Sequence, residues 1–351
     1  MKKIIKIENL KIGDKYPPVF FPDIGTFFNQ NIKTAKKMIE SLIASGAKVV
    51  KGEILHNPNI ALNIHSNEKY LSKKNNIIKE KIRDVIERKI VSFSNYEKIF
   101  SICKKKKIPF VLSVYDYEGA NFAKDIGAGA LKIASSNLTH RPLIEHVCKY
   151  NLPIILDTGR SSYSEIKKSI SWFKIKKFDK IHIQHSPYPP PYTLNKHDLI
   201  MLKSLKKDFS STVGLSDHHS TDEMLYAAVA LGANSIEKGI KPNLMKDDQD
   251  VYHALSIKEF EVVNKKCLNI YKALGKPRRY LSRNAPRHNF RMCIISNRNI
   301  KKNERLSEEN LTFAFPIKGI EAEFLKKILG KRLKKKIKKF TPIKWKNLNA
   351  Y

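Results

Sequence analysis

Short apolar runs recur along most of this chain, and each is followed by a polar turn and a segment with apolar residues at helical spacing. The runs are rich in Val, Ile and Leu and do not alternate strictly with polar residues. This pattern is typical of parallel strands that are buried on both faces. The eight runs are Val19–Ile24, Ala47–Val50, Pro109–Val114, Ala130–Ala134, Pro153–Leu156, Lys180–Gln184, Thr212–Leu215 and Asn234–Ile236.

The segments that follow the runs predict helices, so the sequence predicts consecutive βα units. Eight units over roughly 260 residues match the usual size of a closed (β/α)8 barrel, and we predict this α/β fold. A doubly wound open sheet is the alternative, but no Gly-x-Gly-x-x-Gly follows any run. The predicted helices are Thr34–Ala44, Tyr96–Lys104, Gly119–Ile126, Arg141–Tyr150, Ser164–Phe173, Leu199–Leu205, Thr221–Leu231 and Lys258–Leu274.

Two stretches of the barrel region stand outside the repeat. Residues 1–16 predict a short hairpin or an extended arm, with a turn near Gly13-Asp14. The charged stretch His65–Ser92 is an insertion after the second run, with a helix predicted over Asn76–Lys89. Functional loops often follow barrel strands, so the insertion is interpreted either as a cover for the substrate or as a solvated helix.

A change of composition separates the barrel region from a smaller domain. Residues 276–290 carry two prolines and many cations, so we expect a linker between domains at 1–275 and 291–351. A domain of roughly sixty residues can bury only a small core, so we expect it to be stabilised by packing against other parts of the assembly. Its predicted elements are strands at Met292–Ile295, Leu311–Phe315 and Ile343–Trp345 and a helix at Glu321–Leu329.

The composition bounds the class of protein. No run of eighteen apolar residues exists, so no transmembrane helix is expected. The cysteines (Cys103, Cys148, Cys267 and Cys293) are far apart and form no Cys-x-x-Cys, which favours a reducing cytoplasm. The net charge of +34 comes from 67 Lys and Arg against 33 Asp and Glu. Because lysine is spread over every segment, we expect no nucleic-acid partner as the main ligand.

Two lysines are placed where a charge needs a partner. Lys51 and Lys132 lie in or beside apolar strands, where an unpaired ammonium is costly. They are interpreted as binders of an anion or a carbonyl group, as Schiff-base lysines, or as structural partners of Glu53 or Glu237.

Small hydroxyl groups and imidazoles follow other strands. Ser135, Thr158 and Ser216 lie near predicted helix starts and suit phosphate, although each alone is more often a cap. The stretch Ser216–His219 adds a carboxylate and two imidazoles, of which His218 is the foremost metal candidate. Together these residues predict a mouth that binds an anionic, phosphorylated substrate beside a candidate metal site.

Longer stretches form a pattern that spans nearly the whole chain. They are Lys132–Ser135, Arg141–Glu145, Pro153–Gly159, His185–Pro191, Gly214–His218, Ala228–Ala233, Ile236–Lys238 and His253–Ser256, with Asn299–Glu304, Asn310–Leu311 and Leu329–Gly330 in the tail. In order and spacing, these stretches resemble the sialic acid synthase family.

The resemblance implies a fold, an activity and an assembly. Members combine a (β/α)8 TIM barrel with a small antifreeze-like (SAF) α+β domain. They condense phosphoenolpyruvate with an N-acetylated aminosugar, using a divalent metal (Mn²⁺ or Mg²⁺) that polarises the open-chain aldehyde. The family forms domain-swapped homodimers in which one subunit's SAF domain covers the other's barrel mouth.

The resemblance also assigns site residues by position. Those that would hold the carboxylate and phosphate of phosphoenolpyruvate are Lys132, Ser135 and Ser216. The metal ligand would be His218. The remaining matches are catalytic positions, namely acidic Asp23, the strand-2 lysine Lys51, the sugar-contacting Tyr188 and acidic Asp250 after the last strand.

Five single positions and one three-residue loop depart from the family pattern. The second metal-binding histidine is replaced by Gly239. The others are Asn137 for an acidic residue, Asp157 for a serine, Val114 for a threonine, Phe27-Phe-Asn29 for Asn-His-Asn, and Phe315 for an arginine that would reach a partner's sugar. Candidates to replace the lost ligand are His219, His253 and Asp157.

Three functions follow from these matches and departures. The first is a synthase acting on another acceptor, such as a nonulosonic acid precursor or a simpler aldehyde. The second is a barrel aldolase or lyase with altered metal use, in which Lys51 or Lys132 forms an imine. The third is a non-catalytic homologue that binds a sugar or a partner synthase.

Overall fold

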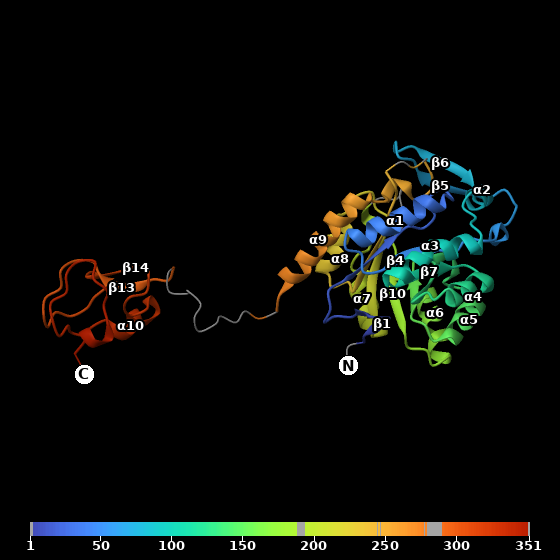
Figure 1. Cartoon of the computed structure of the whole chain (residues 1–351). Coiled ribbons are helices and arrows are strands. Elements are labelled where there is room, and N and C mark those ends of the chain that lie inside the picture. The colour runs from blue at the N-terminus through green and yellow to red at the C-terminus, as the bar shows by residue number, and fades with distance from the viewer. Residues whose placement is uncertain are drawn as a thin grey trace. The chain divides into compact units, whose positions relative to one another are not determined.

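The computed structural model describes residues 3–187, 194–243, 245, 247–276, 278 and 290–349. The chain divides into two compact units, Met1–Gly275 and Lys276–Tyr351, and each is described by itself (Figure 1). Of the expected linker at 276–290, all but residues 276, 278 and 290 lie outside the described residues.

The first unit contains a closed barrel of eight parallel strands, which confirms the predicted (β/α)8 fold. Each strand pairs with the next strand of the barrel in chain order, and the last pairs with the first through Gly239 and Asp23. The strands are β3 (Val19–Asp23), β4 (Val50–Glu53), β7 (Phe110–Val114), β8 (Ala130–Ile133), β9 (Ile154–Asp157), β10 (Ile181–His185), β11 (Thr212–Asp217) and β12 (Ser235–Gly239).

Helices follow the strands and lie outside the barrel (Figure 1). The apolar face of the first, including Met38 and Leu42, joins the strands in one large core. Two later helices begin with capping boxes, in which a serine and a glutamate satisfy each other's backbone amides. The helices are α1 (Ile32–Ala44), α3 (Phe93–Lys106), α4 (Tyr117–Asp125), α5 (Arg141–Val147), α6 (Tyr163–Ile175), α7 (Met201–Phe209), α8 (Glu223–Ala230) and α9 (Ile257–Leu274).

A hairpin closes the N-terminal end of the barrel within residues 1–16, but its turn lies at Glu8-Asn9, where Glu8 has a left-handed φ of 51°, and not near Gly13-Asp14 as predicted. Strands β1 (Ile5–Ile7) and β2 (Leu10–Ile12) are antiparallel. Their apolar side chains form a core cluster with residues near the starts of the barrel strands, such as Val111 and Ile155. The opposite, C-terminal end of the barrel is therefore the end that remains for a site.

The insertion after β4 is a hairpin followed by a short helix. Strands β5 (Asn67–Leu71) and β6 (Ile77–Lys81) are antiparallel, and α2 (Ile82–Glu87) has only six residues. The helix predicted over Asn76–Lys89 is therefore wrong over β6. The physical reason is the preceding turn, where Asn75 adopts a left-handed φ of 63°, a conformation that asparagine tolerates and that reverses the chain.

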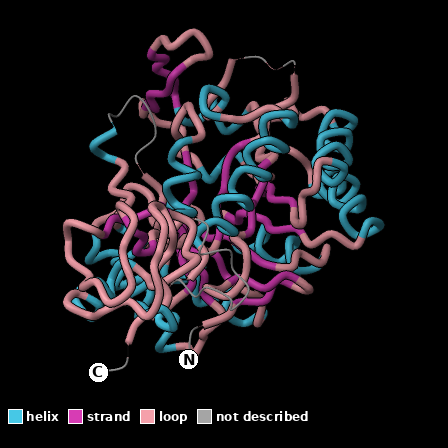
Figure 2. Tube along the Cα trace, turned by 90° about the vertical axis from the view of Figure 1, so that its left-hand side faces the viewer, coloured by secondary structure: helices cyan, strands magenta, loops and turns pink. Residues whose placement is uncertain are grey.

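The second unit has its own small core and much irregular backbone (Figure 2). The first two predicted strands are present as β13 (Cys293–Ser296) and β14 (Leu311–Ala314), and they pair antiparallel. The predicted helix is a 3-10 turn followed by α10 (Leu325–Ile328). The strand predicted at Ile343–Trp345 is wrong, because only an isolated bridge at Pro342 joins this segment to β13. No helix among the described residues is long and apolar enough to cross a membrane.

Candidate active site

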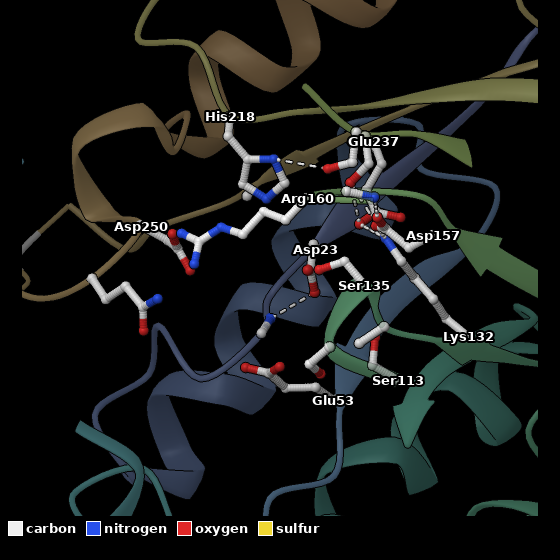
Figure 3. Close-up of a pocket in the computed structure, with 18 of the residues that line it drawn as sticks. Asp23, Glu53, Ser113, Lys132, Ser135, Asp157, Arg160, His218, Glu237 and Asp250 are labelled. Atoms are coloured by element: carbon white, nitrogen blue, oxygen red, sulfur yellow. Dashed lines mark hydrogen bonds and ion pairs between the residues drawn. The ribbon is translucent and has the colours of Figure 1, made fainter. Parts of the chain in front are cut away.

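A pocket with a volume of about 570 Å³ lies at the C-terminal ends of the barrel strands (Figure 3). Residues at the ends of all eight barrel strands, or just after them, line it. Seven of the eight residues assigned from the sequence are in this lining, namely Asp23, Lys51, Lys132, Ser135, Ser216, His218 and Asp250. The eighth, Tyr188, lies outside the described residues.

Lys132 is the centre of a buried network of charges. Its Nζ lies 2.6 Å from Glu237 Oε1 and 2.8 Å from Asp157 Oδ2. The same Nζ lies 3.3 Å from Ser216 Oγ, and that hydroxyl donates to Glu237 Oε1 at 3.2 Å. Asp157, where the resemblance expects a serine, therefore gives Lys132 a second carboxylate partner. Burial without such partners would be strongly unfavourable for each charge.

Lys51 extends the network toward the first strand. Its Nζ donates to Asp23 and lies 3.3 Å from Glu237 Oε1. Burial alone would lower the pKa of Lys51, but Asp23, Glu237 and Glu53 together raise it above its usual value. Burial likewise opposes ionisation of Glu237, yet Lys132 and Lys51 lower its pKa to about 2. Lys51 is thus an ammonium at neutral pH, which disfavours its use as the nucleophile of an imine.

Serine hydroxyls line the side of the pocket formed by β8, β9 and β10. A Cβ on Gly159 would lie 3.1 Å from Ser135 Cβ and 3.2 Å from Ser186 Cβ. The missing side chain therefore lets the two serines approach each other across the end of β9. The next residue, Arg160, also lines the pocket. Hydroxyl groups and a guanidinium are donors that can bind a phosphate group.

The insertion lies at the same mouth. Arg160 Nη2 is 2.6 Å from Glu68 Oε1 on β5, and both residues line the pocket. The insertion is also bound to the segment after β12, because Arg88 Nη2 is 2.5 Å from Asp248 Oδ1 and the Lys73 amide donates to Asp247 at 2.8 Å. These contacts favour the interpretation of the insertion as a cover.

The loop that carries His218 is anchored by Lys238. This lysine is buried, and its Nζ donates to Asp217, to the carbonyl of His219 and to the carbonyl of Thr221 at 3.0 Å. The anchors lie on both sides of His218 in the sequence. The Ser186 hydroxyl lies 3.5 Å from His218 Nδ1. Lys238 therefore acts as a positioning residue for the imidazole.

At Gly239, the position to which the resemblance assigns a second metal histidine, neighbouring side chains leave little room for a larger residue. A Cβ on Gly239 would lie 3.0 Å from two ring carbons of Phe27 and 3.4 Å from the Cβ of Ala254. The aromatic ring of Phe27 therefore occupies the space that a larger side chain at Gly239 would need. Among the residues that the structure describes, no three His, Cys, Asp or Glu side chains converge as a metal cage.

Another imidazole stands beside His218. His253 is buried, its Nε2 lies 3.2 Å from Asp250 Oδ1, and its Nδ1 is buried without a hydrogen-bond partner. Its ring meets the His218 ring edge to face, with 4.9 Å between centroids. Burial lowers the pKa of His253 to about 4, so the ring is neutral at neutral pH. A buried nitrogen without a partner beside His218 fits an open metal site.

The other two candidate ligands are engaged elsewhere. His219 Nδ1 pairs with Thr221 Oγ1 at 2.8 Å, and its ring packs against His197. Asp157 pairs with Lys132. Asn137, a further departure, is absent from the pocket lining and donates to the carbonyl of Val114 at 3.3 Å.

Three further pocket residues were missed from the sequence. The Tyr115 hydroxyl donates to Glu53 Oε2 at 2.7 Å, and burial followed by the charge of Asp23 raises the pKa of Glu53. Tyr115 and Arg160 each follow a strand end, which is a usable signal. Glu68 carries no such signal, because it lies in the insertion.

Comparisons with known proteins show which family and which folds the chain matches. Residues 38–279 match the NeuB family and residues 291–349 match the SAF domain. The N,N'-diacetyllegionaminic acid synthase of Campylobacter jejuni is 29% identical over 322 residues, covering 89% of this chain and 96% of the relative. A pseudaminic acid synthase of Campylobacter jejuni is 26% identical, covering 88% and 90%. The crystal structure of N-acetylneuraminic acid synthetase from Leptospira borgpetersenii has a TM-score of 0.70 at 24% identity, covering 81% and 94%.

Proposed function

The chain belongs to the NeuB family, and from that premise we propose that it condenses phosphoenolpyruvate with the open-chain aldehyde of an N-acetylated aminosugar or a related aldehyde. Its relatives include synthases of legionaminic and pseudaminic acids, which supports a role in carbohydrate biosynthesis. The observation that carries the proposal is the buried network in which Lys51 and Lys132 share Glu237 at the barrel mouth. Such a network keeps two ammonium groups charged inside a pocket.

The phosphoenolpyruvate anion would bind on the Lys132 side of the pocket. Lys132 and Ser216 form one pair of donors, and Ser135 lies nearby across Gly159. Arg160 and Ser186 extend the donors toward the rim. Charged and hydroxyl donors that are already fixed by other hydrogen bonds stabilise developing negative charge without reorganisation.

The reaction would make one carbon–carbon bond and release one phosphate. C3 of phosphoenolpyruvate bonds to the aldehyde carbon, the aldehyde oxygen takes a proton, water adds to C2, and inorganic phosphate leaves. In this scheme Lys51, kept charged by Asp23 and Glu237, stabilises negative charge on oxygen. The covering insertion, bound through Glu68 and Arg160, would exclude bulk water.

A divalent cation, Mn²⁺ or Mg²⁺ by analogy with the family, would be held at His218. When bound, it supplies Lewis acidity toward a carbonyl oxygen. The residues of this chain hold the ring in place, because Lys238 fixes the loop on both sides of His218.

The acceptor would meet the acidic side of the pocket, where Glu53 and Tyr115 form a hydrogen-bonded pair. In the domain-swapped homodimer that we propose, Phe315 stands where the family has an arginine. Its side chain is exposed in the second unit and has no donor for a sugar hydroxyl. We therefore propose an acceptor that is less polar at that position than N-acetylmannosamine. All four cysteines are free, which supports a cytoplasmic location.

Phosphate release tests this proposal. The purified chain is incubated with phosphoenolpyruvate and a panel of N-acetylated aminosugars, with manganese or with EDTA. We expect release that depends on the sugar, is suppressed by EDTA and is lost in His218→Ala, whereas His219→Ala retains it. Phosphate release that is unchanged by EDTA would favour the aldolase or lyase alternative.

A non-catalytic sugar-binding role is the second candidate, and the closed position at Gly239 favours it. It predicts that phosphoenolpyruvate or a sugar binds without turnover. Calorimetric titration of each ligand, alongside the phosphate assay, separates binding from catalysis.

A further inference from the structure

The pocket holds a second imidazole beside His218, from the turn Val251–His253 that follows the last barrel strand. The two rings lie 4.9 Å apart between centroids and 74° apart in plane. A cation about 2.1 Å from one nitrogen of each ring would stand about 3.2 Å from each ring centre. Two such ligands at angles between 90° and 110° place their ring centres roughly 4.5 to 5.2 Å apart. The observed separation falls in that interval.

Asp250 determines which nitrogen of His253 is available. A carboxylate only accepts, so the Nε2 that lies 3.2 Å from Asp250 Oδ1 carries the proton, and Nδ1 carries the lone pair. His253 is 5% exposed, and Nδ1 is buried without a partner. Buried polar atoms without partners are rare. A histidine that donates its other N–H to a carboxylate is the usual arrangement of a metal ligand.

The excess of acidic over basic residues in the pocket also favours binding of a cation. Eight of its lining residues are Asp or Glu and five are Lys or Arg, although the chain as a whole carries 67 basic and 33 acidic residues. An anionic substrate would enter this pocket against a surplus of carboxylates. A divalent cation bound to Nδ1 of His253 would reduce that surplus on the side away from Lys132.

We propose that His218 and His253 together bind one divalent cation, with Nδ1 of His253 replacing the ligand that is missing at Gly239. Asp250 is then a positioning residue that orients His253. Imidazole ligands favour first-row transition metals, whereas Mg²⁺ prefers oxygen, so the site takes Mn²⁺, Co²⁺ or Zn²⁺ in preference to Mg²⁺. Its catalytic use rests on the proposed synthase function, but the binding site itself does not.

Metal titration in the absence of substrates tests the site. Full-length protein is stripped with a chelator and titrated with Co²⁺, followed by visible absorption, and with Mn²⁺, followed by electron paramagnetic resonance. We expect one equivalent to bind to the native chain. His218→Gln and His253→Gln should each weaken binding by at least tenfold, and Asp250→Asn by about 10- to 100-fold.

His219→Gln is the matched control, because this neighbouring imidazole pairs with Thr221 instead. It should bind Co²⁺ like the native chain. The proposal is overturned if the native chain binds no Co²⁺ or Mn²⁺, if His253→Gln binds normally, or if His219→Gln weakens binding as much as His253→Gln.

A second measurement needs no variant of the site. Electron spin-echo modulation from ¹⁴N counts the imidazoles bound to the paramagnetic ion in the native protein, and two are expected. One or none would overturn the assignment of His253. The metal measurements contain no substrate, so they test the binding site separately from the reaction. A protein that binds metal through two imidazoles but releases no phosphate in the turnover assay refutes the synthase proposal alone. A chain that turns over with only one imidazole on the metal refutes this inference alone.

Discussion

Replacing Gly239 by alanine should destabilise the barrel, because the new methyl group meets Phe27. The added Cβ would lie 3.0 Å from two ring carbons of Phe27 and 3.4 Å from the Cβ of Ala254. Overpacking of this kind costs about 1 to 3 kcal/mol. The reduced freedom of the unfolded chain offsets about 0.4 to 1 kcal/mol of that loss. The middle values of the two ranges leave a fall of about 1.3 kcal/mol in the free energy of unfolding.

Thermal and urea unfolding measure this loss, which corresponds to a Tm lower by about 3 to 5 °C for a unit of this size. Phe27→Leu removes the ring, so the penalty of Gly239→Ala should shrink in that background. A double-mutant cycle should then give a coupling energy of about 0.5 kcal/mol or more. If Gly239→Ala is as stable as the native chain, or its penalty is the same with and without Phe27, the ring does not close this position and the reasoning is refuted.

Three further predictions concern the buried network. Lys132→Met leaves the carboxylates of Asp157 and Glu237 without their main partner, and should lower the free energy of unfolding by about 3 to 5 kcal/mol in urea denaturation; an equal loss in Lys132→Arg, which retains the charge, would contradict this. Because Lys132 and Lys51 hold the pKa of Glu237 at about 2, below its ordinary 4.5, its stabilising contribution is complete above about pH 4.5 and is lost as the pH falls toward about 2. Thermal melts should show this loss, and Glu237→Gln should have a flatter pH dependence over the same range; an unchanged slope would count against it. Asp157→Ser removes a carboxylate that competes with the substrate for Lys132, so calorimetry should show tighter binding of phosphoenolpyruvate, and weaker binding would contradict the proposed location of the anion.

The barrel could be predicted from the sequence because its strands are apolar at their starts. The predicted strand boundaries were less accurate at the C-terminal ends of the strands, which line the pocket. The last strand was predicted to end at Ile236 but continues to Gly239, and the second was predicted over Ala47–Val50 but runs from Val50 to Glu53. Lys51, Glu237 and Lys238 lie inside these strands, since the interior of the barrel mouth is polar. Charged residues that satisfy one another across a barrel hide the apolar signal on which strand prediction depends.

The insertion could not be predicted in detail for another reason. Its strands carry many Lys and Glu residues, and their pairing depends on the turn at Asn75 and on a contact between Tyr70 and Glu80. Neither the turn nor the contact produces a periodic pattern of apolar residues in the sequence. The position of Glu68 at the pocket follows from this tertiary arrangement alone.

The candidate site residues were predictable to the extent that they follow strands. His218 and Asp23 belong to this group. His253 could be suspected but not placed, because the loop after Gly239 determines where its ring lies. Likewise, the close approach of Gly239 and Phe27 joins two residues more than two hundred positions apart, and only the folded barrel brings them into contact.

Observation of the new carbon–carbon bond tests the proposed condensation most directly. Phosphoenolpyruvate labelled with ¹³C at C3 is incubated with the native chain, manganese and the aminosugar panel, and the products are followed by ¹³C and ³¹P nuclear magnetic resonance. The proposed function predicts that, for one acceptor, the labelled carbon becomes a methylene bonded to the former aldehyde carbon while inorganic phosphate appears in equal amount. Labelled pyruvate with phosphate and no bond to any sugar would contradict it.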